Sequence, residues 1–512
     1  RVVAHTLGEP LPSSIDCGAV PRRRRRPGPE QPVLPAAGTR VPRPRPLKQE
    51  RRTVNARPLN VAVIGAGPAG IYASDILSKS GMEVCIDLFE RLPAPYGLVR
   101  YGVAPDHPRI KQIIVALYKI LQRGDIRLIG NVEVGRDISV AELQEHYDAI
   151  IFSTGADTDA PLDIPGVDAP ECYGGADFVS WYDGHPDYPR TWPLNAKEIA
   201  VLGNGNVALD IARVLSKHAD DLLVTEIPEN VYEGLKSSPV TDVHVFGRRG
   251  PAQIKFTPLE LRELSHSRDV DIVLYEEDFE FDEASDEAIQ TNNQVKTMMK
   301  TLTTWLTDQE EGEQTASRRL HLHFLQSPHE ILGEDGKVVG IRMERNKLDG
   351  KGGIEGTGEF VDYPVQAVYR AIGYFGSELP EVGYDADKGV ITNVEGRVVD
   401  ENGEHVPGLY ATGWIKRGPV GLIGSTKGDA LETITHLLED RENLYTAPEP
   451  DADTFSDYLD SKGIRYTTWE GWHRLDDHEK ALGAASQDAK GEPRERVKVV
   501  DRDEMIRISR GE

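Results

Sequence analysis

The chain has 512 residues, of which 39% are hydrophobic, and its formal net charge is −25. This length predicts two or three domains with apolar cores, and because no run of eighteen apolar residues occurs, we expect no membrane span. The acidic balance argues against nonspecific binding to nucleic acid, which requires a cationic surface.

The amino-terminal stretch, residues 1–56, differs from the rest in composition. It contains ten prolines up to Pro46 and the run Arg22–Arg26, and residues 1–52 carry a net charge of +8, against −33 for the remainder. No amphipathic period is present, so we expect disorder. A basic leader can direct a protein to mitochondria, but the prolines disfavour the helix that such leaders form. A flexible extension, or an upstream stretch translated by annotation error, is the preferred interpretation.

The first ordered unit begins with a buried strand, Val61–Ile64, and continues into a helix, Ile71–Ser80. The glycines of the GxGxxG motif between them are Gly65, Gly67 and Gly70. They allow a tight turn, close backbone approach to a pyrophosphate and close helix packing. The next strand, Val84–Phe89, ends in Glu90, which can accept hydrogen bonds from a ribose. The combination predicts a dinucleotide site, and a glycine-rich turn without a ligand is the alternative.

A second unit begins with the strand Ile199–Leu202 and has a helix from about Leu209 to Ser216. The residues of its GxGxxA loop are Gly203, Asn204, Gly205, Asn206 and Val207. We expect the partner strand to be Val243–Phe246, with the intervening insertion looped out. That strand leads to Arg248 and Arg249 instead of an acid. Because arginine pairs bidentately with phosphate, this predicts NADP, whose ribose carries a 2′-phosphate, and a solvated turn is the alternative.

Two dinucleotide sites with opposite charges at the strand end indicate two ligands. The order is similar to that of flavin nucleotide-disulfide reductase-like enzymes, which bind FAD first and the nicotinamide nucleotide second. We therefore expect an α/β fold with two Rossmann-like nucleotide-binding domains, one for FAD and one for NADP. The expected boundaries are 1–56 for the extension, 57–157 for the first part of the FAD domain, 158–366 for the NADP domain, and 367–512 for the second part of the FAD domain with short carboxy-terminal helices.

The later segments differ in character. Residues 276–317 are acidic and polar and predict a surface helix with loops, whereas 447–512 predict short exposed helices and turns. Between them lies "GLYATGWIKRGPVGLIGSTKGDALETI", residues 408–434, a strand, a turn and a helix. Backbone amides at Gly421, Leu422 and Ile423 can meet a flavin, and the positive end of the helix stabilises charge on it. Trp414 offers a face for stacking, or simply packs.

Five motifs occur in one order: "VIGAGPAGIYA", "YGLVRYGVAPDHP", "GNGNVALDIAR", "VFGRRGPAQIKFTPLELREL" and "GWIKRGPVGLIG". Over residues 57–512 the chain thereby resembles the adrenodoxin reductase-type NADPH–ferredoxin reductases. The residues that the resemblance assigns to FAD are Ala69, Glu90, Leu98, Val134, Trp414 and Gly421–Ile423. Those that it assigns to NADP are Asn204–Val207, Arg248, Arg249, Glu260 and Gly421. It also places His107 and Glu263 near the ring system, in supporting roles, although a purely structural histidine is the alternative.

The resemblance implies that NADPH reduces FAD, which then passes electrons singly to a ferredoxin. The three cysteines, Cys17, Cys85 and Cys172, form no CxxC motif, which disfavours an internal dithiol, an internal iron–sulfur cluster and a structural metal. The alternatives are a flavin monooxygenase or NADPH oxidase that uses oxygen, and a sensor that binds FAD and NADP without turnover.

For an acidic ferredoxin, cations in motifs near the predicted flavin are candidate docking residues: Arg100, Arg109, Lys111, Lys416 and Arg417. The amino-terminal stretch does not look like a mitochondrial leader of the family, so we expect a bacterial cytoplasmic location in preference to the mitochondrial matrix.

Overall fold

A computed structural model describes residues 57–512, apart from positions 313 and 422. The described residues belong to one compact unit, Val54–Glu512. The predicted extension, 1–56, lies outside the described residues. None of the described helices is long and apolar enough to cross a membrane.

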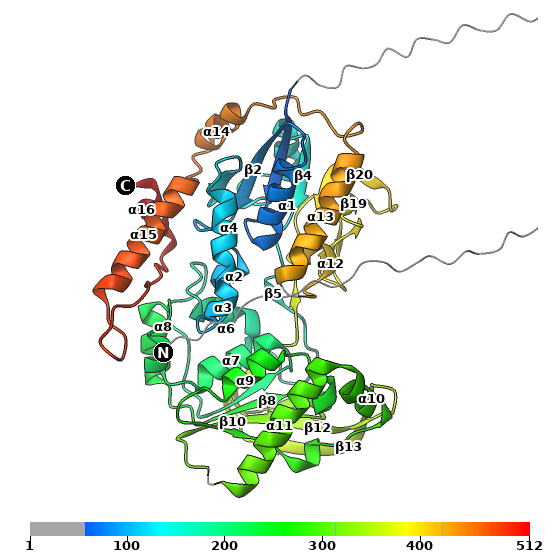
Figure 1. Ribbon diagram of the computed structural model, residues 1–512, viewed down its shortest axis with the longest axis vertical. Helices are drawn as coiled ribbons and strands as arrows, with labels where there is room; N and C mark the ends of the chain where they lie inside the picture. Colours follow the sequence, from blue (N-terminus) through cyan, green and yellow to red (C-terminus); the bar gives the residue numbers. More distant parts are fainter. Residues whose placement is uncertain (1–56, 313, 422) are drawn as a thin grey trace, which may run out of the picture. The chain divides into compact units, whose positions relative to one another are not determined.

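The first sheet has seven strands in the order β18-β19-β20-β4-β1-β2-β3 (Figure 1). Their bounds are β1 Leu59–Ile64, β2 Val84–Glu90, β3 Arg127–Gly130, β4 Ala149–Phe152, β18 Asn393–Val394, β19 Arg397–Val399 and β20 His405–Ala411. Strands β20, β4, β1, β2 and β3 are parallel, and β18 and β19 run antiparallel at one edge. The returning chain therefore completes a sheet that the first 100 or so described residues begin.

Helices cover both faces of this sheet. One face packs on α1 (Pro68–Ser78), α4 (Ile113–Leu121), α13 (Ile423–Glu439), α15 (Trp469–Ala485) and α16 (Arg502–Arg510). The other face packs on α5 (Val140–His146) and α14 (Ala452–Ser461). The parallel strands are hence buried on both sides, as their continuous apolar runs require.

The second sheet has six parallel strands in the order β6-β14-β7-β8-β10-β9. Their bounds are β6 Cys172–Gly174, β7 Glu198–Leu202, β8 Asp242–Phe246, β9 Val270–Val273, β10 Arg318–His323 and β14 Ala367–Arg370. The predicted pairing of the second unit is confirmed, because Leu202 of β7 lies opposite Phe246 of β8. The looped-out interval contains η1 (Ala219–Leu222) and α8 (Glu229–Ser237).

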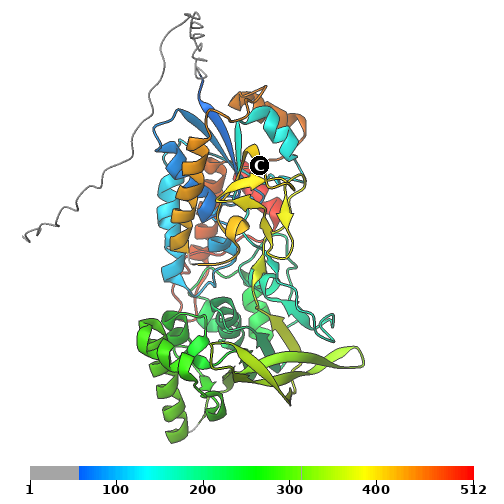
Figure 2. The ribbon, with the colours of Figure 1, turned by 90° about the vertical axis from the view of Figure 1, so that its right-hand side faces the viewer.

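The second sheet is covered by helices on one face only. These are α6 (Gly175–Tyr182), α7 (Asn206–Ser216), α8, α9 (Pro258–Leu264) and α11 (Asn293–Glu311). The other face packs on a three-stranded antiparallel sheet of β11 (Gln326–Glu334), β12 (Lys337–Leu348) and β13 (Ile354–Tyr363). Figure 2 shows these green helices and yellow-green strands on opposite sides of the lower part. The alternation of apolar strands and helices along the sequence does not predict this three-stranded sheet.

The remaining elements are short. The helices are α2 (Leu98–Tyr101), α3 (Pro108–Lys111), α10 (Glu283–Thr291) and α12 (Trp414–Arg417), with 3₁₀ turns η2 (Pro251–Gln253) and η3 (Glu276–Asp278). Strand β5 (Thr158–Asp159) pairs with β15 (Tyr374–Phe375), and β16 (Tyr384–Asp385) pairs with β17 (Val390–Ile391). The β5–β15 pair joins the two chain segments that connect the large sheets.

Two helix starts and the burial of one helix differ from the sequence-based expectation. Helices α1 and α7 begin at Pro68 and Asn206, three residues earlier than expected, because each starts directly after the second glycine of its loop. In the acidic segment the surface helix is present as α11, but it also buries Met298 and Leu302 in the core.

The carboxy-terminal expectation of short exposed helices was wrong for α15. This helix spans 17 residues and buries Trp472, Leu475 and Glu479. The ring of Trp472 packs edge-on against Tyr96, with 5.6 Å between ring centroids, and the Arg100 guanidinium lies 5.1 Å from it. The carboxy-terminal segment therefore contributes to the core beneath the first sheet.

Trp472→Ala should lower the free energy of unfolding by about 3–5 kcal/mol, because it removes a buried indole from this core. Chemical denaturation followed by circular dichroism measures the change. Leu482→Ala, on the same helix but 37% exposed, serves as the control and should change stability by about 0.5 kcal/mol or less. Equal effects of the two substitutions would contradict the assigned packing of α15.

Candidate functional site

The GxGxxG loop lies at the carboxyl edge of the first sheet, between β1 and α1. Gly65 has φ +108°, and a Cβ there would lie 2.5 Å from the Ser153 carbonyl oxygen. A Cβ at Gly70 would collide with the carbonyl oxygen of Gly65. Both positions therefore require glycine, the first for the turn and the third for close packing of helix on strand.

Glu90, at the end of β2, holds this loop. Its carboxylate accepts the backbone N–H of Ala66 at 3.0 Å and that of Leu92 at 3.1 Å. Burial raises the pKa of Glu90, against the opposing effect of these hydrogen bonds and of Arg91. Each carboxylate oxygen retains a second lone pair, so Glu90 can both fix the loop and accept a ribose hydroxyl.

The other residues predicted to contact FAD come from several elements. Ala69 and Leu98 are half-buried, at the starts of α1 and α2, and Val134 is buried in the loop after β3. A Cβ at Gly413 would lie 2.6 Å from the Cβ of Ala69, so the returning chain meets the first loop there. Ile423 begins α13, and Leu422 lies outside the described residues.

Both helices that follow glycine loops begin without a side-chain cap. Gly67 and Gly205 are the N-cap residues of α1 and α7, and neither helix has a side-chain hydrogen bond at its start. In contrast, α5, α9 and α15 are capped by Ser139, Thr257 and Thr468. A Cβ at Gly205 would have no neighbour within 4 Å. Free N–H groups, a positive helix end and open space are what a pyrophosphate needs, so both loops fit dinucleotides.

The second loop lies at the carboxyl edge of the second sheet. Gly203 has φ +137°, and a Cβ there would collide with the Ala371 carbonyl oxygen. The side chain of Asn206 accepts the Thr257 N–H at 3.1 Å, and the Asn204 carbonyl accepts the Lys255 N–H at 3.2 Å. The loop is thus held against the segment that follows β8.

Arg248 and Arg249 follow β8 and are exposed. Within the described range neither guanidinium makes a hydrogen bond or an ion pair with a side chain, whereas many other arginines pair with carboxylates. Because β8 lies beside β7, the two cations stand near the loop that begins at Gly203. This arrangement fits an anionic group on the ribose of a dinucleotide.

His107 connects the loop after α2 to helices α7 and α9. Its Nε2 lies 2.7 Å from Asp210 and its Nδ1 lies 2.6 Å from Glu263. Burial disfavours the imidazolium, but the hydrogen bond and the negative charge of Asp210 outweigh that effect and raise the pKa of His107. The structure therefore brings together His107 and Glu263, which the sequence had only assigned to the same region.

Glu260 lies one turn before Glu263 on α9 and is buried. Its Oε2 has no hydrogen-bond partner among the described residues, and burial raises its pKa. A buried acceptor without a partner indicates a place for a ligand donor.

Trp414 and the second nucleotide loop pack against the same small apolar cluster. This cluster consists of Ala156, Ala176 and Tyr374, and Val207 and Trp414 are partly buried against it. Ala156 follows β4 of the first sheet, and Val207 follows the loop of the second. The carboxyl edges of the two sheets are therefore in contact here, where a flavin and a nicotinamide must meet for hydride transfer.

Two charged residues that the sequence did not single out complete the site. Arg213 of α7 is fully buried and forms a bidentate ion pair with Asp106, at 2.8 and 2.7 Å. It also lies 2.9 Å from Asp210. The sequence offered one signal for Arg213, namely a cation within the motif "GNGNVALDIAR". Only the fold shows that this cation is buried and that Asp106 is its partner.

The candidate docking cations mostly serve other contacts. Four of the five are paired, Arg100 with Glu479, Lys111 with Glu226, and both Lys416 and Arg417 with Asp429. Arg109 is exposed and, among the described residues, forms no ion pair. Of this set, only Arg109 remains a docking candidate.

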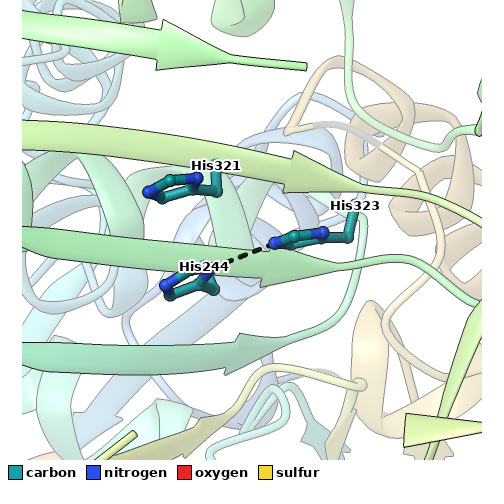
Figure 3. A group of neighbouring side chains, drawn as sticks. All are labelled: His244, His321 and His323. Atoms are coloured by element: carbon teal, nitrogen blue, oxygen red, sulfur yellow. Dashed lines mark hydrogen bonds between the residues drawn. The ribbon is translucent and has the colours of Figure 1, made fainter. Parts of the chain in front are cut away.

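Three histidines of the second sheet lie close together: His244 of β8 and His321 and His323 of β10 (Figure 3). His244 Nδ1 is 3.0 Å from His323 Nε2, and the rings of His244 and His321 are stacked, 4.2 Å apart and 11° from parallel. His321 also bonds Asp242 and Tyr275. Stacked rings direct their nitrogen lone pairs along separate planes, so this arrangement favours a hydrogen-bonded stack over a shared metal.

Comparison with known proteins shows consistent similarity. Residues 59–245 match the family model described as pyridine nucleotide-disulphide oxidoreductase. The chain is 39% identical over 472 residues to NADPH-ferredoxin reductase FprA of Mycobacterium tuberculosis, covering 89% of this chain and 100% of that protein. It is 38% identical over 460 residues to mitochondrial NADPH:adrenodoxin oxidoreductase of Bos taurus, covering 88% and 91%. The structure of Mycobacterium tuberculosis FprA in complex with NADPH matches with a TM-score of 0.78 at 37% identity, covering 89% and 100%.

The histidine stack should make the fold acid-sensitive. Burial lowers the pKa of His244 from 6.5 to about 3, so below pH 6.5 the unfolded chain takes up a proton that the folded chain does not. Stability is therefore lost as the pH falls from 6.5 towards 3. His244→Asn should make the fall of the melting temperature between pH 6.5 and 4 shallower than in the parent protein. His266→Asn, at an exposed position, should leave the slope unchanged, and an unchanged slope in both variants would refute the prediction.

Proposed function

The chain belongs to the family of NADPH–ferredoxin and NADPH:adrenodoxin reductases, and we propose that it transfers electrons from NADPH through FAD to a ferredoxin. The observation that carries this proposal is the pair of uncapped glycine loops, one followed by Glu90 and the other by Arg248 and Arg249. The relatives are named for this reaction, and they span nearly the whole described part of the chain.

The FAD site that we propose uses residues at the carboxyl edge of the first sheet. The glycine loop and the start of α1 receive the pyrophosphate, and Glu90 accepts the ribose hydroxyls. The other proposed FAD contacts are Ala69, Leu98, Val134, Trp414 and Gly421–Ile423. When bound, FAD accepts a hydride from NADPH and releases the electrons one at a time.

The NADP site that we propose uses the edge of the second sheet. The loop Gly203–Val207 and the start of α7 receive the pyrophosphate, and the guanidinium groups of Arg248 and Arg249 bind the 2′-phosphate. The partnerless carboxyl oxygen of Glu260 accepts a donor from the nucleotide. Sheet membership supports a FAD domain whose first part is residues 57–157, followed by an NADP domain that begins at 158. Because β14, Ala367–Arg370, belongs to the second sheet, we propose that the NADP domain extends to Arg370 instead of ending at 366 as expected, and that the second part of the FAD domain follows it.

We propose a supporting role for His107 and Glu263. The imidazole, held between two carboxylates, fixes the loop "APDHP" to α7 and α9, and the hydrogen bond and charge of Asp210 raise its pKa against the effect of burial. Hydride transfer requires no proton abstraction by a side chain, so this role is one of position and charge.

A ferredoxin is the acceptor that fits this site best. Among the described residues no two cysteines stand together as a dithiol, because Cys85 and Cys172 are both free. Electrons must then leave the protein to an external carrier, and the relatives name a ferredoxin or adrenodoxin. Exposed Arg109 is our candidate for contact with an acidic partner. The bacterial relative supports a cytoplasmic location.

Replacing Arg248 and Arg249 together by Ala should raise the KM for NADPH by about ten- to a hundredfold, because charge-assisted hydrogen bonds to the 2′-phosphate are lost. The KM for NADH should change by less than about twofold. Steady-state reduction of ferricyanide measures both. Arg268→Ala provides the control, since this exposed arginine pairs with Asp221 instead. Equal losses with both nucleotides would refute the assignment.

The acceptor is tested by NADPH-dependent reduction of cytochrome c with and without ferredoxins of the source organism. A ferredoxin should raise the rate by at least about tenfold, because it is the one-electron carrier between flavin and cytochrome. Rapid NADPH oxidation with oxygen alone would instead favour a monooxygenase or oxidase. No flavin bleaching within seconds in stopped-flow mixing would favour a binding protein without turnover.

A further inference from the structure

Tyr374 lies where the two nucleotide-binding edges meet. It begins β15 and pairs with Asp159 of β5 in the two-stranded connection between the large sheets. Its side chain is 8% exposed and forms a small buried apolar cluster with Ala156 and Ala176. Val207 of the second glycine loop and Trp414 of the returning chain both pack against this cluster, so Tyr374 belongs to the apolar contact between the proposed NADP loop and the proposed FAD segment.

The hydroxyl of Tyr374 is buried and has no hydrogen-bond partner among the described residues. The hydroxyl of Tyr182, on α6, is also buried and also has no hydrogen-bond partner among the described residues. For both side chains, burial and the nearby carboxylates of Asp210 and Asp183 raise the pKa, so each hydroxyl keeps its proton and remains a donor. A buried hydroxyl without a partner destabilises the fold, and such groups are rare in proteins unless a ligand or water satisfies them.

Two neighbouring tyrosines, buried Tyr369 and half-buried Tyr363, show a contrast. The hydroxyl of Tyr369, five residues earlier in the chain, bonds Trp192 at 3.0 Å, and that of Tyr363 bonds Gln326 at 3.0 Å. These two hydroxyls are satisfied within the protein fold. The hydroxyl of Tyr374 is left without a partner at the place where the two nucleotide edges come into contact.

We propose that Tyr374 is a positioning residue for the nicotinamide half of NADPH. Its ring belongs to the apolar cluster against which Val207 and Trp414 pack, and its hydroxyl donates a hydrogen bond to a polar group of that half, the carboxamide or the adjoining ribose. This inference rests on the proposed function and assigns one of its sites a residue that the motifs do not contain. It separates the roles of the two halves of the nucleotide, because Arg248 and Arg249 act on the adenosine half.

Tyr374→Phe in the FAD-loaded enzyme tests the proposal. The substitution removes one oxygen and keeps the ring, so the fold should be retained. Loss of one hydrogen bond predicts a three- to tenfold increase in the Kd for NADP⁺ by calorimetry. The Kd for 2′,5′-ADP, which lacks the nicotinamide half, should be unchanged. In stopped-flow mixing with NADPH, the rate of flavin bleaching should fall, because the nicotinamide is held less well in the orientation that hydride transfer requires.

Tyr369→Phe is the matched control, since it removes a buried hydroxyl of the same domain that bonds only within the protein. It should leave the affinities for both ligands and the bleaching rate unchanged. The proposal is overturned if Tyr374→Phe binds NADP⁺ as the parent enzyme does, which would assign the hydroxyl to an ordered water. It is also overturned if the variant loses NADP⁺ and 2′,5′-ADP affinity equally, which would indicate a general disturbance.

Failure of this proposal is distinguishable from failure of the proposed function. If the parent enzyme binds NADP⁺ and its flavin is bleached by NADPH, the function stands whatever Tyr374→Phe does. If the parent enzyme does neither, both fail together.

Discussion

The buried ion-pair cluster of His107, Asp106, Asp210 and Arg213 fixes the geometry on which the site depends. Arg213 is fully buried and His107 is 2% exposed, and a buried charge is tolerated only when it is paired and hydrogen-bonded. Asp106 and His107 belong to the loop after α2, whereas Asp210 and Arg213 belong to α7. Separation of these residues would leave uncompensated charges in the interior. The loop after α2 therefore stays attached to α7, the helix that follows the second glycine loop.

A second buried network acts through the carboxy-terminal segment. Arg100 of α2 pairs with Glu479 of α15, and Lys498 lies 2.9 Å from Glu226 and donates to the Asp183 carbonyl oxygen at 3.0 Å. Burial lowers the pKa of Lys498 to about 8, although Glu226 opposes the shift. The segment after α13 therefore links residues of both nucleotide-binding parts. This explains why Arg100 and Lys111, which the sequence offered as docking cations, are paired in the fold.

The charge of the residues at the strand ends determines which nucleotide each site suits. Glu90 is buried and bonded to its own loop, which suits neutral ribose hydroxyls and would repel a phosphate. Arg248 and Arg249 stay exposed beside the second loop, which suits a phosphate. Trp414 and Tyr374 belong to the apolar contact between the two edges, where we propose that the two nucleotides meet.

The sequence by itself determined both glycine loops, because the tight turn and the packing of helix on strand leave no room for a Cβ at Gly65 or Gly203. It also determined the strands β1, β2, β7 and β8, whose apolar runs are continuous, and the charge that follows β2 and β8. These features are local, so spacing along the chain is enough to predict them.

Only the tertiary structure decided the partners of charges and hydroxyls. The pairing of Arg100 with Glu479 joins residues on opposite ends of the described chain, and no local pattern carries that information. The same holds for Tyr374, an ordinary strand residue in sequence, which the fold places in the apolar cluster against which Val207 and Trp414 pack. The packing of the three-stranded sheet against the second sheet and the burial of α15 against the first sheet also depend on the tertiary structure. Each element covers an apolar face that the other elements leave exposed, and this is a property of the assembled fold and not of any one segment.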